Sequence, residues 1–305
     1  MPKPCTLATE TASRVLKAKV RALRREIEPC RSEDPDGIHD LRVASRRIRA
    51  VLTAHRRLFE RPAYDNYQRH VQRITRALGK ARELDVCLGL LEGRRNRLRG
   101  APRSAATSAV RWLAAARKAE SASIAQAVAL AGGPAFDELL MALFEGMKRT
   151  KRCYLDDAAK ALRNRYRRLR EADRAWRNAA SEESLHGIRI QFKKLRYACE
   201  TFAGLYGADM GRFIARCKEL QQVLGDWNDL RVLRNHVVAA SYEAPAPAAA
   251  GFPALREALE REIEGELTLY VGGADAFFAP ANEKQAYACF AHPTTPCCRT
   301  RSAAK

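Results

Sequence analysis

Basic side chains recur at helical spacing in residues 38–49, directly after a histidine. The histidine and three arginines stand at positions i, i+3, i+7 and i+10: His39, Arg42, Arg46 and Arg49. An α-helix turns by about 100° per residue, so these four side chains fall within an arc of roughly 80°. Arginine can place two N–H groups on phosphate oxygens, and histidine can donate from either ring nitrogen. The spacing therefore predicts a helix face that binds anions.

A second copy of this pattern lies in residues 185–197. Setting His39 on His186 gives an offset of 147 residues and pairs Arg42 with Arg189, Arg46 with Lys193, Arg47 with Lys194 and Arg49 with Arg196. A shorter element, Leu-Gly followed by an acidic residue and leucine, occurs at residues 78–84 and again at 224–230, with an offset of 146. Two motifs in one order at nearly one offset predict an internal duplication of about half the chain.

The side of each basic stretch opposite its cations is apolar, so both stretches are predicted to be amphipathic helices. Asp34 followed by Pro35 is a predicted helix start, and Ser181 followed by two glutamates is another. Each predicted cap stands five residues before its histidine. Glu83 and Asp229 occupy matching positions in the Leu-Gly elements, and we expect each to hydrogen-bond a basic side chain on the histidine helix of its half.

Composition predicts an all-α protein. The chain has 305 residues, 47% of them hydrophobic, and its long segments are filled with alanine, leucine, arginine and glutamate rather than with strand-forming runs. Helical spacing is found in residues 9–28, 35–59, 64–91, 100–133, 136–176, 213–238 and 255–271. We predict one domain over residues 9–280, made of two repeats at about 9–131 and 134–280, and a disordered tail at 281–305.

The two histidine stretches and the two Leu-Gly elements resemble the conserved histidine α-helical domain, the CHAD family. The resemblance covers about residues 9–280 and is specific because both halves match. It implies an all-α duplicated helical bundle, with two pseudo-symmetric halves around a basic central cavity that binds inorganic polyphosphate. On this basis the predicted polyphosphate-binding residues are the basic positions of both copies: His39, Arg42, Arg46, Arg47, Arg49, His186, Arg189, Lys193, Lys194 and Arg196.

Charge supports a polyanionic partner, because 55 lysines and arginines against 35 acids give a formal net charge of +20. Arginines and lysines between residues 148 and 170 add much of this charge, and the sequence does not select which of them reach the cavity. Nine cysteines without a C-x-x-C pair are predicted to be mostly buried reduced thiols, with no metal site and no cofactor. The sequence has no apolar run that would span a bilayer and no signal peptide, which predicts a cytoplasmic protein.

Three functions remain open at this stage. The first is non-enzymatic polyphosphate binding, which would target the protein to polyphosphate granules or regulate their use. The second is a phosphate-polymer enzyme or its accessory subunit, but the Glu-x-Glu-x-Lys strand of a triphosphatase barrel is missing, since Glu262-x-Glu264-x-Glu266 is helical and lacks the lysine. The third is non-specific nucleic-acid binding, for which the basic helices carry few stacking aromatics. If the histidines bind the anion, affinity should rise as pH falls toward 6.

Overall fold

The computed structural model describes residues 8–148 and 154–294, and its backbone in these ranges is almost entirely helical. The described residues contain no β-strand, and one isolated antiparallel bridge joins Phe59 to Met147. The all-α prediction is therefore confirmed.

The first half of the chain forms eight α-helices in the described residues: α1 (Ala8–Arg25), α2 (Ile27–Arg31), α3 (Pro35–Ala54), α4 (Arg61–Ala77), α5 (Gly79–Arg95), α6 (Gly100–Lys118), α7 (Ser121–Gly132) and α8 (Pro134–Glu145). The second half forms α9 (Tyr154–Asn178), α10 (Glu182–Phe202), α11 (Ala208–Tyr242), α12 (Ala246–Ala249), α13 (Phe252–Phe277) and α14 (Pro280–Ala291). Short 3-10 turns follow α3 at Arg56–Leu58 and α10 at Ala203–Leu205.

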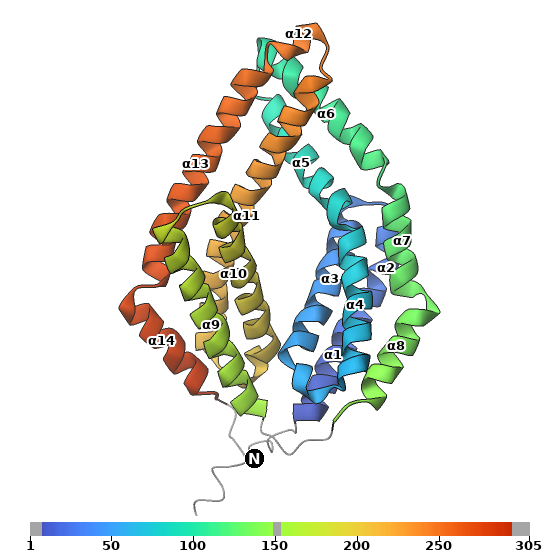
Figure 1. The fold of residues 1–305 in the computed structure, drawn as a ribbon, viewed down its shortest axis with the longest axis vertical. Helices are drawn as coiled ribbons and strands as arrows, with labels where there is room; N and C mark the ends of the chain where they lie inside the picture. Colours follow the sequence, from blue (N-terminus) through green and yellow to red (C-terminus); the bar gives the residue numbers. More distant parts are fainter. Residues whose placement is uncertain (1–7, 149–153, 295–305) are drawn as a thin grey trace, which may run out of the picture.

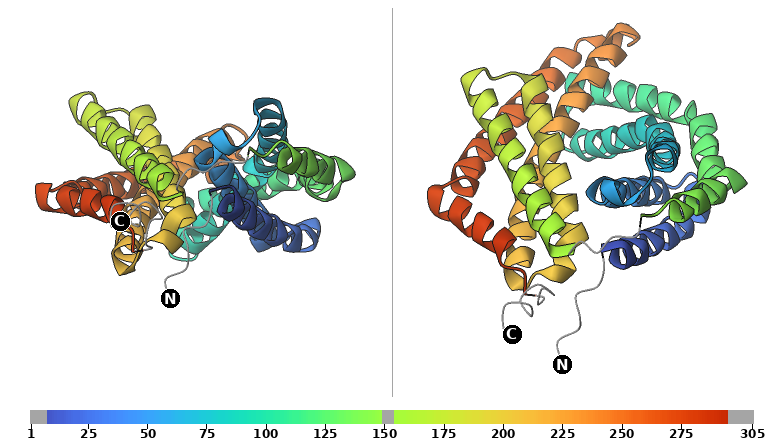
Figure 2. Two further views of the ribbon diagram at one scale, coloured as in Figure 1. Left: turned by 90° about the horizontal axis from the view of Figure 1, so that it is seen from below. Right: turned by 60° about the horizontal axis from the view of Figure 1, so that its bottom comes forward.

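The helices form two arms that meet at one end of the molecule (Figure 1). One arm holds α1–α4, α7 and α8, and the other holds α9, α10, α14 and parts of α11 and α13. At the meeting point α5 and α6 pack against α11, and α6 also packs against α12 and α13. The histidine helices α3 and α10 make a second contact between the arms. Figure 2 shows α9 and α10 lying side by side.

The hydrophobic core is divided differently from the two repeats that the sequence predicts. One cluster of buried side chains is built mainly from α1–α4, α7 and α8, and includes Tyr67 and Phe136. The larger cluster holds the second half together with residues of α5 and α6, such as Leu84 and Leu113. Helices α5 and α6, which fall in the first predicted repeat, thus pack into the core of the second arm. This packing joins the two arms through buried apolar surface.

The starts of both histidine helices confirm the sequence prediction. The Asp34 carboxylate accepts hydrogen bonds from the backbone N–H groups of Asp36 and Gly37, and Pro35 is the first residue of α3. Ser181 and Ser184 form a reciprocal capping box at the start of α10. A Cβ atom on Gly37 would lie 2.4 Å from the carbonyl carbon of Pro29, so the first turn of α3 can approach α2 this closely only because the position is glycine.

Several predicted segments differ from the structure. Residues 281–305 were predicted to be a disordered tail, but α14 spans Pro280–Ala291 and buries Phe290; residues 295–305 lie outside the described ranges. Helical spacing was found only in residues 9–28 and 35–59 of this part of the chain, yet a short helix, α2, runs to Arg31. The predicted helix over residues 100–133 is two helices, α6 and α7, which separate after Lys118.

The Leu-Gly element is a helix break in one half and not in the other. Leu78 separates α4 from α5 in the first half of the chain. Gly225 lies inside the unbroken 35-residue helix α11, and a Cβ atom there would meet nothing within 4 Å. Glycine therefore stands at a helix break at Gly79, and at neither a break nor a close contact at Gly225.

No single helix in the described ranges is long and apolar enough to cross a membrane. Helices α7 and α8, which bend by 43° at their junction, pass such a test only as a pair and only by length and composition.

Candidate functional site: a cationic pocket between four helices

The apolar faces of α3 and α10 are fully buried, which fixes the direction of their basic faces. Ile38, Leu41 and Ile48 of α3 have no exposed surface, and the same holds for Ile188 and Leu195 of α10. Each helix is held against its own arm by this buried stripe. Because α3 and α10 also contact each other, the cations on their remaining faces are brought together.

A pocket of about 470 Å³ lies where α3 and α10 meet α4 and α9. Fifteen described residues line it: Arg46, Arg49, Ala50, Thr53 and Ala54 from α3, Gln68 from α4, Ala161, Asn164, Arg165 and Arg168 from α9, and Ile190, Lys193, Lys194, Tyr197 and Ala198 from α10. Six of these fifteen residues are lysine or arginine and none is acidic. A cavity with this lining attracts anions and offers them many donors.

The cations are crowded enough to disturb one another. Burial, and then the charges of Arg46 and Arg189, lower the pKa of Arg42 to about 10. Burial, followed by the charges of Arg189, Arg46 and Arg42, lowers the pKa of Lys193 to about 6. Burial and the neighbouring Arg165 and Arg168 likewise lower the pKa of Lys194. The free pocket therefore stores mutual repulsion that a bound anion would relieve.

Several buried donors in this region have no hydrogen-bond partner among the described residues. They are the Nε atoms of Arg42, Arg49 and Arg189. An unpaired buried donor costs free energy, and each such atom in a folded protein calls for a partner that the chain does not supply. Anion oxygens would be suitable acceptors for the guanidinium groups that they reach.

Four of the ten predicted site residues line the pocket, namely Arg46, Arg49, Lys193 and Lys194. Arg42 and Arg189 adjoin it, since both act electrostatically on Lys193 and on each other. The other four predicted residues, His39, Arg47, His186 and Arg196, are not among the lining residues.

His39 and Arg47 are exposed on α3. Burial and then the charge of Arg82 lower the pKa of His39. The Arg196 guanidinium donates to the Gln221 side chain at 2.8 Å and to the Glu200 carboxylate at 3.1 Å. Arg196 is thus occupied by residues of its own arm.

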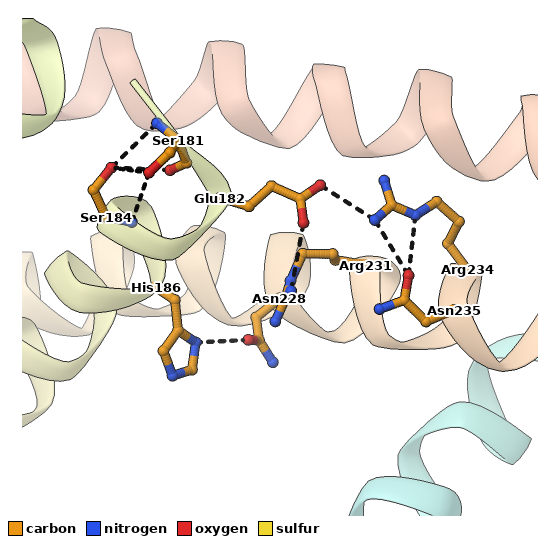
Figure 3. A network of polar contacts seen from close by, with 8 residues as sticks. All are labelled: Ser181, Glu182, Ser184, His186, Asn228, Arg231, Arg234 and Asn235. Atoms are coloured by element: carbon orange, nitrogen blue, oxygen red, sulfur yellow. Dashed lines mark hydrogen bonds and ion pairs between the residues drawn. The ribbon is translucent and has the colours of Figure 1, made fainter. Parts of the chain in front are cut away.

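His186 belongs to a polar network at the start of α10 (Figure 3). Its Nδ1 atom lies 3.0 Å from the Asn228 side-chain oxygen of α11. The Glu182 carboxylate accepts from Arg231 at 3.4 Å and from Arg234 at 3.2 Å. Burial lowers the pKa of His186, although the Asn228 contact opposes this effect. The network ties the first turn of α10 to α11 and so orients the basic face of α10.

Neither of the two matching acids makes the expected hydrogen bond within the described ranges, and only Asp229 contacts the histidine helix of its own half. Asp229 lies 3.8 Å from Arg189 on the histidine helix of its own half, as an ion pair rather than a hydrogen bond. Glu83 instead pairs with Lys80 and with His236 of the opposite half, at 3.0 Å from the His236 ring. These two contacts lower the pKa of Glu83 to about 2. The prediction was wrong for Glu83, which bridges α5 and α11.

Sequence reasoning did not select Arg165 and Arg168, which bring two further cations to the pocket from α9. The signal for them is their spacing with Ala161 and Asn164, at i, i+3, i+4 and i+7, which is one helix stripe. Of the other basic residues in this part of the sequence, those at positions 149–152 lie outside the described ranges.

Tyr197 of α10 also lines the pocket. Its ring lies 5.7 Å from the Arg46 guanidinium and 4.7 Å from that of Arg196, so it joins cations of both histidine helices. The described ranges hold no group of three or more His, Cys, Asp or Glu side chains able to bind a metal ion.

The fold and the site together describe an all-α protein with a cation-lined pocket between two basic helices. The sequence model of the CHAD domain matches residues 14–238, and the chain therefore belongs to the CHAD domain family. A comparison with curated proteins found no matching sequence.

Two solved structures share the fold. The chain is similar to PptA from Streptomyces chartreusis, with a TM-score of 0.68 and 17% identity, over 88% of this chain and 100% of that one. It is also similar to the CHAD domain from the plant Ricinus communis, with a TM-score of 0.65 and 20% identity, over 97% of this chain and 96% of that one. At these identities the likeness concerns the fold.

Proposed function

We propose that the protein binds inorganic polyphosphate in the cationic pocket and does not hydrolyse it. The observation that carries this proposal is the lining of the pocket, where six lysines and arginines from three helices meet and no described lining residue is acidic. The resemblance of the histidine helices to the CHAD family points to the same ligand. We infer a polyanionic ligand from the density of positive charge in the pocket, and not from groups that would recognise nucleic-acid bases.

Polyphosphate suits this site because each internal phosphate carries one strongly acidic group and little else to recognise. Closely spaced guanidinium and ammonium groups on rigid helices match a row of such anions. The buried Nε atoms of Arg42, Arg49 and Arg189 supply donors that lack partners within the described chain. Tyr197 is the one aromatic residue among the described lining residues, so the pocket offers little surface for stacking successive bases.

Polyphosphate binding would also determine where in the cell the protein is found. Binding to polyphosphate in the cytoplasm would bring the protein to polyphosphate granules, where it would act by attachment rather than by catalysis. A specific nucleic-acid partner is not part of this proposal, and neither is insertion into a membrane.

A competition experiment tests the ligand. Long-chain polyphosphate and duplex DNA, at equal concentrations of phosphate groups and constant salt, would compete for the fluorescently labelled protein. Polyphosphate should displace DNA, whereas displacement of polyphosphate by DNA would favour a nucleic-acid function. Salt must be held constant because both polyanions bind more weakly as ionic strength rises.

A second measurement tests the absence of catalysis. The protein would be incubated with polyphosphate and Mg²⁺ or Mn²⁺, and released phosphate and chain length would be followed. We expect chain length to stay constant over hours at a protein concentration that saturates binding. Release of phosphate that is lost in a pocket variant would replace the binding proposal with an enzymatic one.

A further inference from the structure

Lys193 is the pocket residue whose surroundings least favour a charged side chain. Arg42 and Arg46 of α3 and Arg189 of α10 act on its ammonium group as like charges. Among the described residues, the opposing carboxylate is Asp229 of α11, and it lies beside Arg189 at 3.8 Å. No ion pair between Lys193 and an acidic side chain is formed within the described ranges.

Such an arrangement favours the neutral amine. Removing an ammonium from water penalises its charge, and three neighbouring guanidinium groups add to that penalty. The pKa of Lys193 is accordingly lowered to about 6. A lysine activated in this way, by burial and by adjacent cations, is a nucleophile at neutral pH, whereas an exposed lysine is almost entirely protonated.

The same pocket holds groups that would anchor a phosphate beside this amine. Arg46, Arg49, Arg165 and Arg168 line the cavity together with Lys193, and its volume of about 470 Å³ admits a small molecule. A compound that carries a phosphate next to a reactive carbonyl would place both groups within one site. Small acyl phosphates have this composition.

We propose that Lys193 is an acylation site for small acyl phosphates, whose phosphate group is held by the arginines of the pocket. The inference shares the anion pocket with the proposed function and does not require polyphosphate to be its natural occupant. In the reaction the Nζ lone pair attacks the carbonyl carbon, a C–N bond forms and the bond from carbon to the phosphate oxygen breaks. The leaving phosphate takes the proton that the amine loses, so the products are the amide and hydrogenphosphate.

Acylation would oppose binding of a polyanion. An amide cannot take up the proton that a bound anion favours on Lys193, and the added acyl group occupies part of the cavity. The modification would therefore act as an off switch on the anion site.

The test is site-resolved acetylation of the full chain by acetyl phosphate, followed by mass spectrometry between about pH 6 and 9.5, a range that starts near the lowered pKa of Lys193 and ends below the usual pKa of an exposed lysine. Lys160, an exposed lysine of α9 that does not line the pocket, is the internal control. At pH 7 we expect Lys193 to react at least tenfold faster than Lys160. The Lys193 rate should level off above about pH 7, because its amine is already neutral, while the Lys160 rate keeps rising.

A neutral acyl donor separates nucleophilicity from phosphate anchoring. With p-nitrophenyl acetate, the preference for Lys193 should persist but be smaller than with acetyl phosphate. Arg168→Gln should slow acetyl phosphate labelling at Lys193 severalfold and slow labelling by the neutral ester much less. A thermal melt of this variant verifies that it folds.

Three results would overturn the inference: equal rates at Lys193 and Lys160, parallel pH profiles for the two residues, or the same preference for Lys193 with both donors. Each is independent of polyphosphate affinity, which is measured separately. Failure of acylation with intact polyphosphate binding would refute only the acylation site. Acylation without polyphosphate binding would refute only the proposed ligand.

Discussion

The two histidine helices match in sequence, yet they contribute differently to the pocket. Position 49 of α3 and position 196 of α10 are both arginine, but Arg49 lines the cavity while Arg196 is held by Glu200 and Gln221. At the offset of 147, Glu200 corresponds to Thr53, so α3 lacks the carboxylate one turn further along. The repeated sequence pattern thus determines which cations each helix carries. The neighbouring side chains determine which of these cations remain available to a ligand.

The partner helices differ in the same way. In the second arm, α9 packs along α10 and adds Arg165 and Arg168 to the cavity. In the first arm, α1 packs along α3, but the described lining residues include none from α1. The pocket is therefore asymmetric, with more of its cations supplied by the second half.

The largest expected effect comes from removing the central cations of both helices together. Changing Arg42, Arg46, Arg189 and Lys193 to glutamine should weaken polyphosphate binding at least about 100-fold, or roughly 3 kcal/mol, because several charge-assisted contacts are lost. The matched control changes four exposed arginines outside the pocket, Arg97, Arg99, Arg103 and Arg111. Titration calorimetry at one salt concentration measures both. Equal losses would mean that a diffuse positive field, and not this pocket, binds the chain.

Arg46 of α3 and Lys193 of α10 occupy equivalent positions in the two histidine helices, but one is an arginine and the other a lysine. The two residues should therefore respond differently to pH. With a pKa of about 6, Lys193 is mostly neutral in the free protein at pH 7, and a bound anion raises this pKa. Binding then takes up a proton above about pH 6, so affinity should fall about tenfold per pH unit as the pH rises from roughly 6.5 to 7.5.

Lys193→Arg should remove most of this dependence, because arginine stays charged over the whole range. The double variant His39→Gln, His186→Gln should keep the dependence, since neither histidine lines the cavity. The opposite outcome, with the dependence lost only in the histidine variant, would restore the histidine role that the sequence suggested.

A third experiment gives Arg49 the kind of carboxylate neighbour that Arg196 has in Glu200. Thr53→Glu places a carboxylate four residues after Arg49, where Glu200 stands relative to Arg196, and puts a negative charge on the pocket wall. We expect about fivefold weaker polyphosphate binding, or roughly 1 kcal/mol for a partly exposed pair. Thr53→Gln is the matched control for size. If both variants bind alike, charge at this position does not govern the site.

Much of the fold could be predicted from the sequence because its signals were local. The caps at Asp34 and Ser181, together with the buried stripes of α3 and α10, depend only on residues within each helix. Helix α14 escaped prediction because it starts at Pro280 after Ala279, which offers no side-chain cap, and Phe290 is apolar in a segment that otherwise has weak periodicity. Its burial depends on packing against α9 and α11.

The site was less predictable, because contacts between different helices determine which basic side chains face the pocket. The sequence could place Arg196 on the basic face of α10, but its capture by Gln221 depends on how α11 packs against α10. Arg165 and Arg168 lie in a helix with arginines on many sides, and Arg170 of that helix pairs with the buried Asp173 instead. Which of these arginines face the pocket depends on how α9 is rotated about its own axis when it packs against its neighbours.

The smallest expected effect concerns the Leu-Gly element, which interrupts the helix in one half and not in the other. Gly225 stands in the middle of α11, where a methyl group added at its Cα would meet no atom within 4 Å, so Gly225→Ala should raise the free energy of unfolding by about 0.5–1 kcal/mol. Gly79 also has free space, but it is the first residue of α5, where helix propensity counts for less, and Gly79→Ala should gain under half as much. Urea denaturation measures both variants. A gain at Gly79 equal to that at Gly225 would mean that the break at Leu78 does not persist in solution, and that the two halves share one continuous helix at this element.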